Sequence, residues 1–290
     1  MRVGAAPYGG DMSDRAPALS PSRASDFKQC PLLYRYRAVD RLPEPPSAAA
    51  TLGTLVHGVL EDLFGLPADL RTEAAAIDMA MPRWERMLEE RPELAGLHAS
   101  DAAEAQWLGD TRERLRTYFE MENPARIEPE GRELLVEVQL EDGPLLRGII
   151  DRVDVAEDGS IRIIDYKSGK SPAPQYSGSA KFQMRFYALV VERLRERRPA
   201  LTRLLYLRDG VHVDLRPTDE DIAAIEHEVR ELWREITAAA TEGVFRPKRS
   251  KLCGWCSFQA LCPEFGGTML PIDADAVEAA VGVRPSPTRL

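Results

Sequence analysis

The hydrophobic period changes at Glu133, and this change restricts the folds open to a chain of 290 residues. Before Glu133 apolar residues recur at helical spacing, whereas after it they fall in short runs typical of strands. Three strands are predicted, joined by the turn sequences Glu-Asp-Gly-Pro and Glu-Asp-Gly-Ser, over 134–140, 145–155 and 160–167. Turns this short join antiparallel neighbours, so we expect an antiparallel meander.

Helices are expected on both sides of the meander. A capped helix begins near Ser22 with Cys30 toward its end, and a linker rich in proline and alanine covers 43–50. Helical spacing then predicts a helical subdomain over 51–122, in the segments 51–64, 72–91 and 101–122. After the meander we expect a helix, two strands around an Asp-Gly turn and a long helix, over 179–198, 201–208, 211–216 and 218–242. This order of elements predicts an α/β protein.

Composition leaves the partner of the chain open. The chain is 44% hydrophobic and 29% charged, so it can bury a sizeable core. Its net charge of −9 argues mildly against nucleic acid, but basic residues gather around Arg35, Lys167 and Lys248, and a basic groove can sit on an acidic body. No apolar run approaches the roughly 18–20 residues of a membrane helix, and no signal-peptide core opens the chain. We therefore expect a cytoplasmic protein without a membrane partner.

The two ends of the chain look different from its middle. Residues 1–18 are small and polar with Pro and Gly, which predicts a disordered leader, and residues from 266 to 290 predict a loosely held tail. Between them we expect one domain over 19–265. Its expected parts are the helical subdomain, a catalytic core and a C-terminal helix with a cysteine cluster, over 51–122, 132–216 and 218–265.

Two acids and a lysine are the most informative side chains of the meander. Asp165 and Lys167 lie two apart on one strand and so point to the same face, and pairing of neighbouring strands can bring Asp151 beside them. Two carboxylates in a small space suit Mg²⁺, which activates water and polarises phosphate. The alternative is a surface salt-bridge cluster. It fits poorly because the strand around Asp165 is apolar on both faces, and because Gly148 leaves room for a close approach.

This pattern also carries a resemblance to a known family. Gly148-x-x-Asp151 followed by Asp165-Tyr166-Lys167 resembles the signature of the PD-(D/E)XK nucleases in their RecB-like form. The resemblance implies a restriction-endonuclease-like core, a mixed sheet flanked by helices. It further implies that Asp151, Asp165 and the backbone carbonyl of Tyr166 bind Mg²⁺ or Mn²⁺, and that Lys167 assists the nucleophile.

Three residues outside the meander match further parts of the same family. His57 stands in Gly53-x-x-x-His57-x-x-x-Glu61, and Gln183 and Tyr187 share a helix face at i,i+4 spacing. Taken alone, His57 is more often a structural histidine and the Gln-Tyr pair an ordinary packing face. The resemblance implies instead that His57 is a metal ligand. It implies that Gln183 and Tyr187 line the active site, contacting DNA or orienting the lysine.

All four cysteines fall in an unusual arrangement, with Cys30 alone and three others clustered as Cys253-x-x-Cys256 and Cys262-Pro263. A disulfide framework is improbable in a cytoplasmic chain. Structural Zn²⁺ is an alternative, although a four-cysteine zinc site usually comes as two close pairs. The three-plus-one layout suits a [4Fe–4S] cluster and resembles the iron-staple nucleases of the AddB and CRISPR-associated spacer-trimming type. That resemblance implies a cluster that joins the first helix to the C-terminal segment.

The resemblance covers about 20–265 and implies a metal-dependent DNA nuclease, an exonuclease on single strands or ends in repair, recombination or related DNA processing. No GxxxxGK[ST] loop occurs, so a separate helicase or ATPase is an expected partner. The alternative function is a non-catalytic DNA-binding or scaffold subunit of a helicase–nuclease or CRISPR-adaptation complex. A third interpretation is a zinc-stabilised structural protein.

Overall fold

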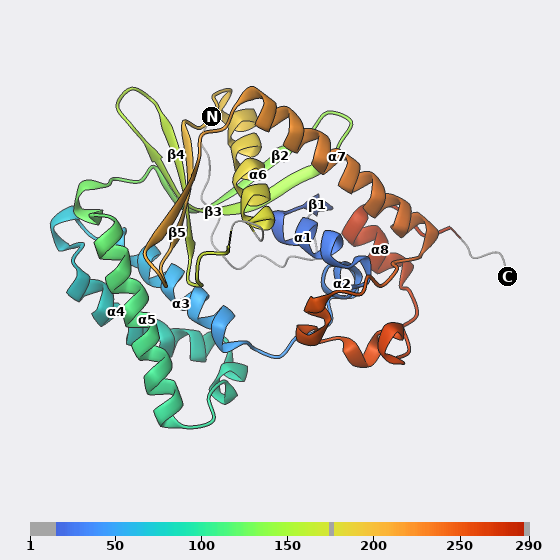
Figure 1. Ribbon diagram of the computed structural model, residues 1–290, viewed down its shortest axis with the longest axis horizontal. Coiled ribbons are helices and arrows are strands. Elements are labelled where there is room, and N and C mark those ends of the chain that lie inside the picture. The colour runs from blue at the N-terminus through green and yellow to red at the C-terminus, as the bar shows by residue number, and fades with distance from the viewer. Residues whose placement is uncertain (1–15, 174–176, 287–290) are drawn as a thin grey trace. The chain divides into compact units, whose positions relative to one another are not determined.

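A computed structural model describes residues 16–173 and 177–286 (Figure 1). The chain divides into two compact units that are not consecutive in sequence. Unit 1 contains the residues up to Pro45, Leu135–Gly148 and Asp219 onward, and unit 2 contains Pro46–Leu134 and Ile149–Thr218. Two strands therefore have residues in both units, β2 (Gly131–Gln139) and β3 (Leu145–Val155).

The sheet of unit 2 is mixed. The C-terminal part of β3 pairs antiparallel with β4 (Ile161–Lys167), as the meander predicts. β4 pairs parallel with β5 (Leu201–Tyr206), which pairs antiparallel with β6 (Val211–Leu215). Parallel neighbours need a crossover, and α6 (Gly178–Arg195) provides it between β4 and β5. The mixed sheet with flanking helices matches the expected core.

Side chains on β4 and β5 separate into two sets. Ile164 and Tyr166 of β4 belong to one apolar cluster with α3, α4 and α5 (Ala48–Leu63, Glu73–Glu90 and Asp101–Met121), which lie grouped together in Figure 1. Leu204 and Tyr206 of β5 pack instead against Met184 of α6. Because side chains alternate along a strand, Asp165 and Lys167 share the face that α6 covers.

The three helices expected over 51–122 have nearly the predicted boundaries. α3 begins at Ala48, inside the segment expected to be a linker. Ser47, which has an extended backbone, is the last residue before the helix. α4 continues through Pro82. Three short 3₁₀ turns connect these elements, Ala68–Leu70, Pro92–Gly96 and Pro124–Arg126.

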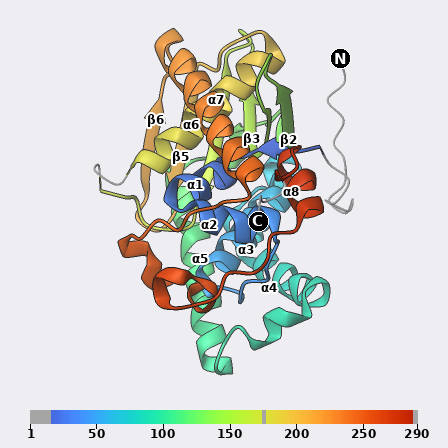
Figure 2. The same cartoon turned by 90° about the vertical axis from the view of Figure 1, so that its right-hand side faces the viewer.

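Unit 1 is built on α7 (Asp219–Glu242), whose buried side is formed by apolar residues at helical spacing, Ile222, Ile225, Val229, Leu232 and Ile236. β1 (Ala18–Leu19) pairs parallel with the start of β3. Ser20 caps α1 (Pro21–Gln29), accepting from the amide of Arg23 at 3.3 Å. α2 (Pro31–Tyr34) and a π-helical turn (Arg35–Val39) follow. Figure 2, turned by 90° from Figure 1, shows α1, α2, α7 and α8 of this unit.

Within the described residues, the segments near both chain ends contain regular structure that the sequence did not predict. Helix α8 (Ala274–Val281) lies in the segment expected to be a tail, and Val277, Ala280 and Val281 are buried. Arg35 donates to the carbonyls of Leu270 and Pro271, both at 2.8 Å. A helix of eight residues covers only about two turns, which is too short a segment to show a period in the sequence. Of the expected leader, residues 1–15 lie outside the described residues, and Ala18 is buried in β1.

Candidate active site

Asp151 is tied to the neighbouring strand by its side chain. The paired register of β3 and β4 ends at Arg152 opposite Ile164, and one further step would set Asp151 opposite Asp165. Instead of a backbone pair, the amide of Tyr166 donates to Asp151 Oδ2 at 2.6 Å. The carboxylate is 9% exposed. Strand pairing therefore brings the first predicted acid beside the second.

Asp165, Lys167 and Gln183 form one connected group on the face covered by α6. Lys167 Nζ lies 2.6 Å from Asp165 Oδ2 and donates to Gln183 Oε1 at 2.8 Å. The other end of the Gln183 amide donates to Asp165 Oδ1 at 2.7 Å. Gln183 thus bridges the acid and the lysine, and the position of both charged groups depends on a residue of α6.

His57 reaches the site from α3. Its Nε2 lies 2.9 Å from the carbonyl oxygen of Tyr166, and its Nδ1 lies 3.5 Å from Asp151 Oδ1. Because a carbonyl can only accept, Nε2 carries a proton in this arrangement. The ring also meets the Tyr166 ring edge-on, with centroids 5.8 Å apart. Gly53, one turn earlier, leaves room for Ser168, since an added Cβ would stand 3.1 Å from Ser168 Oγ.

Glu133 joins this group although no sequence pattern singles it out. Its carboxylate lies 3.8 Å from His57 Nδ1, and its backbone adopts φ 41°, the left-handed region that non-glycine residues rarely occupy. Such strain costs on the order of 1–3 kcal/mol and often marks functional sites. Strand alternation puts Glu133 on the same polar side as Glu137 and Gln139, so the sequence offers no signal that separates it from them.

The charges around this group shift two pKa values. Burial alone would lower the pKa of His57, but Asp151, Glu133 and Asp165 outweigh burial and raise the pKa to about 10. Burial, and then the Asp151 carboxylate, raise the pKa of Asp165 to about 6 against the opposing charges of Lys167 and His57. Negative charge is therefore in excess here, and a cation would relieve it.

The donor atoms fit a hard divalent cation. Ligand atoms of His57, Glu133 and Asp151 all lie within 4.8 Å of one another. Asp165 is outside this group of three, and its buried Oδ2 is paired with Lys167 Nζ. Carboxylate oxygens with one imidazole nitrogen suit Mg²⁺ or Mn²⁺ better than a soft metal. This group of three thus contains two of the predicted ligands, His57 and Asp151, together with Glu133, which the sequence did not predict.

Tyr187 and Arg152 contact the strands that carry the site residues, β3 and β4. The hydroxyl of Tyr187 donates to the carbonyl of Ile149 at 2.6 Å, and the side chain is buried. Tyr187 therefore anchors the strand that carries Asp151. Arg152 is fully buried and donates to the hydroxyl of Tyr166 at 2.8 Å, while its charge is balanced by Glu122 and Asp154. The sequence pattern misses Arg152 because arginine is common on exposed strand faces.

The four cysteines are all in unit 1. They are free thiols that line one cavity together with Leu33, Tyr36 and Phe258. The amides of Lys248 and Ser250 donate to the sulfurs of Cys30 and Cys253, both at 3.3 Å. Among the described residues no three cysteine sulfurs lie within 4.8 Å of one another, so the structure does not by itself show the iron–sulfur staple.

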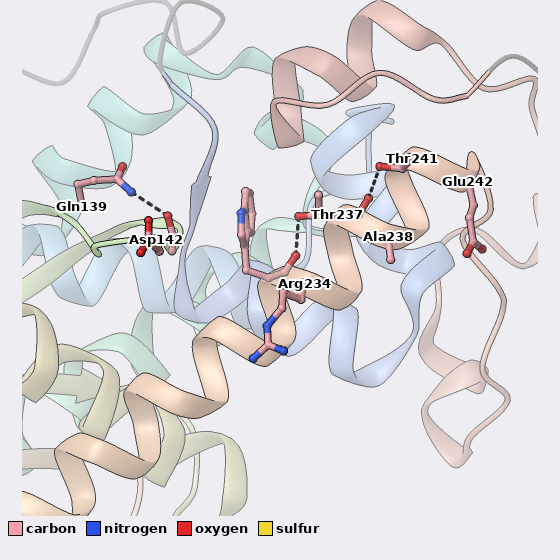
Figure 3. Close-up of a pocket in the computed structure, with 9 residues that line it drawn as sticks. Gln139, Asp142, Arg234, Thr237, Ala238, Thr241 and Glu242 are labelled. Carbon is pink, nitrogen blue, oxygen red and sulfur yellow. Dashed lines mark hydrogen bonds between the residues drawn. The ribbon is translucent and has the colours of Figure 1, made fainter.

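A groove of about 670 Å³ along α7 of unit 1 is not part of this site (Figure 3). Gln139, Trp233, Arg234 and Glu242 are among the residues that line it. Its threonines are turned to their own helix, because Thr237 and Thr241 donate to the carbonyls of Trp233 and Thr237 at 2.6 and 2.8 Å. None of the sequence-predicted site residues lines this groove.

Comparison with known proteins identifies the class of protein to which this fold and this site belong. The family model described as PD-(D/E)XK nuclease superfamily matches residues 18–263, and the chain belongs to this superfamily. Among the described residues no helix is both long and apolar enough to cross a membrane.

Individual relatives are similar over parts of the chain. The Gene 69 protein of Mycobacterium phage D29 is 30% identical over 200 residues, which are 61% of this chain and 70% of that protein. A subunit of the ATP-dependent helicase/deoxyribonuclease of Streptococcus mutans is 39% identical over 64 residues, 22% of this chain and only 6% of that subunit. The crystal structure of a candidate exonuclease of Eubacterium rectale has a TM-score of 0.55 at 14% identity, covering 82% of this chain and 86% of that one. This last likeness shows the fold alone.

Proposed function

We propose that the protein is a metal-dependent DNA exonuclease of the RecB-like type that acts on single strands or DNA ends in repair, recombination or related DNA processing. The observation that supports this most is the group Asp165–Gln183–Lys167 beside His57, Glu133 and Asp151. A scaffold protein has no need of a buried carboxylate with a raised pKa, because that arrangement lowers stability at neutral pH. We also propose that residues 19–265 act as one nuclease domain.

The residues divide into those that hold the cation and those that act on the nucleophile. Mg²⁺ or Mn²⁺ would be held by His57, Asp151 and Glu133, and also by Asp165 and the Tyr166 carbonyl, which the family resemblance adds. When bound, the cation would act as a Lewis acid on the phosphate and lower the pKa of a water molecule. The Lys167 side chain is 30% exposed and its ammonium lies beside Asp165. There the ammonium can orient a water molecule or offset negative charge on the phosphate. Gln183 keeps the ammonium at that place.

Digestion of end-labelled single-stranded DNA with Mn²⁺ or Mg²⁺ tests the proposal. The wild type should degrade the strand, and Lys167→Ala and Asp165→Ala should not, while both variants stay folded. The position of the label then gives the polarity. A wild type that is inert with both metals on single strands and on ends, or variants as active as the wild type, would favour the non-catalytic scaffold function.

We further propose that Cys30, Cys253, Cys256 and Cys262 hold a [4Fe–4S] cluster. With Zn–S bonds of about 2.3 Å, a tetrahedral zinc site places its four sulfurs roughly 3.8 Å apart, whereas no three of these four sulfurs all lie within 4.8 Å of one another. Thiolates bound to four separate iron atoms are farther apart, and backbone amides aimed at Cys30 and Cys253 are typical of such sites. The cluster would supply a cross-link within unit 1, not redox chemistry in the cleavage.

Iron and sulfide analysis of anaerobically purified protein tests this cluster. About four iron atoms per chain with broad visible absorbance are expected, and Cys262→Ser should lose both. Zinc without iron would contradict the proposal.

The match to a helicase/deoxyribonuclease subunit supports a further proposal, that a separate helicase or ATPase acts with this chain. Co-purification from cells with and without added nuclease would test that partner.

A further inference from the structure

The stretch between Glu242 and Glu264 in unit 1 has an unusual charge. The whole chain carries 47 acidic against 38 basic residues, yet this stretch contains no acidic residue and four basic ones, Arg246, Lys248, Arg249 and Lys251. All four are exposed. Many other arginines of the chain pair with carboxylates, but none of these four does so within the described residues. An exposed group of cations without carboxylate partners is the footprint expected of phosphate binding.

An exposed tryptophan lies within the same stretch. Trp255 is 87% exposed at the end of a 3₁₀ turn (Lys251–Trp255), whereas Trp84 and Trp107 are buried. Tryptophan is rarely left in water, because its large apolar surface favours burial. No ring contact or hydrogen bond holds the Trp255 indole among the described residues. The indole is therefore largely exposed and can stack on a flat ligand.

A second aromatic ring lies beside one of the cations. The guanidinium of Arg249 stands over the ring of Phe265, 5.3 Å from its centroid, and Phe265 is 42% exposed. Cations interleaved with aromatic rings are the combination that proteins use for single-stranded nucleic acid, where phosphates meet the cations and bases stack on the rings. The backbone of the stretch consists of short turns and loops, so it offers no apolar helix face for insertion into a lipid surface.

We propose that Trp255, with Arg249 and Lys251, forms a binding surface for single-stranded nucleic acid, referred to below as the Trp255 surface. This proposal rests on the proposed nuclease function for its choice of partner. Trp255 stacks on a base, and the two cations contact the neighbouring phosphates. The surface would thus hold the strand by features common to all bases and would be indifferent to sequence.

Binding of a fluorescein-labelled oligothymidylate, followed by anisotropy without added divalent cation, tests the Trp255 surface apart from cleavage. Trp255→Ala should weaken binding about tenfold, and Trp255→Phe should recover part of the loss because it keeps a ring. Leu252→Ala is the matched control, since Leu252 lies on the same turn and is 52% exposed but has no π face. Its affinity should stay within about twofold of the wild type.

The salt dependence separates the cations from the ring. For single strands the slope of log K against log salt is about −0.7 per phosphate contact, so Arg249→Ala/Lys251→Ala should flatten the slope by about 1.4. Trp255→Ala should leave the slope unchanged. The control is Arg234→Ala/Arg284→Ala, which removes two exposed arginines of unit 1 that pair with carboxylates. Equal melting midpoints and visible spectra show that the variants are folded.

The outcomes distinguish this inference from the proposed nuclease activity. A wild type that cuts DNA, together with a Trp255→Ala variant that binds as tightly as the wild type and an unchanged salt slope, would overturn the Trp255 surface alone. A wild type that binds through Trp255 but never cuts would keep the surface and reject the nuclease. Trp255-dependent binding to anionic phosphatidylserine vesicles, with none to the oligonucleotide, would overturn the surface in favour of a lipid one.

Discussion

The side-chain amide of Gln183 donates to Asp165 while its carbonyl oxygen accepts from Lys167, with distances of 2.7 and 2.8 Å. One neutral side chain on α6 therefore fixes both members of the acid–lysine pair on β4. Asp165 and Lys167 would attract each other without Gln183, but their rotamers would be less restricted.

Gln183→Leu should therefore lower kcat by about tenfold to a hundredfold, because the ammonium loses its fixed place. KM and DNA affinity should change little, since Gln183 does not hold the substrate. Steady-state cleavage kinetics separate the two quantities. Gln106→Leu, on the exposed face of α5, is the control. A rise in KM with unchanged kcat would show that Gln183 binds DNA instead.

Glu133→Gln should weaken Mn²⁺ binding by about tenfold or more, because the strained Glu133 loses its charge beside His57 and Asp151. Electron paramagnetic resonance of free Mn²⁺ measures this without any cleavage. Glu137→Gln, on the same strand and exposed, should bind as the wild type does. If both variants bind Mn²⁺ equally, Glu133 is not a ligand.

Asp165→Asn should stabilise the metal-free protein at high pH. The pKa of Asp165 is about 6 in the folded protein and roughly 3.9 when unfolded, so the folded state binds the proton more tightly. Its contribution to stability is present below about pH 4 and is lost as the pH rises through about 6. Above that range the free energy of unfolding of the variant should exceed that of the wild type by on the order of 2 kcal/mol. At pH 4 the two proteins should differ by almost nothing.

Urea unfolding at pH 4 and pH 8 in the absence of divalent cations measures this difference. Asp78→Asn replaces an exposed aspartate of α4 and should show no such dependence on pH. A gain of equal size at both pH values would mean that packing, not the buried charge, causes the effect.

Arg152→Met should lower the free energy of unfolding by about 3–5 kcal/mol, because the buried Glu122 would lose its close partner and keep only Arg162 at 3.8 Å. Arg203→Met breaks a pair with Asp214 at the surface and should lower it by less than about 1 kcal/mol. Denaturant titrations of the two variants give both values. Losses of similar size would show that the buried network contributes no more than a surface pair.

Local periodicity in the sequence anticipates most of the elements. The helical spacing over 51–64 and the strand alternation over 160–167 both predict elements that the structure contains, because each depends only on neighbours along the chain. The same alternation places Asp165 and Lys167 on one face. α8 is not anticipated, because its eight residues cover only about two helical turns, too short a segment to reveal a period.

The sequence suggests the acid–lysine pair as a candidate site by its local spacing and residue types, and it suggests His57 only through the match to the family pattern. The folded chain is needed to show that Glu133 joins His57 and that Arg152 lies under Tyr166. The position of the Glu133 side chain depends on a left-handed backbone conformation within β2. The burial of Arg152 depends on partners that are distant in the sequence, such as Glu122, which is 30 residues away. Contacts between distant segments leave no period in the chain, so local patterns cannot predict them.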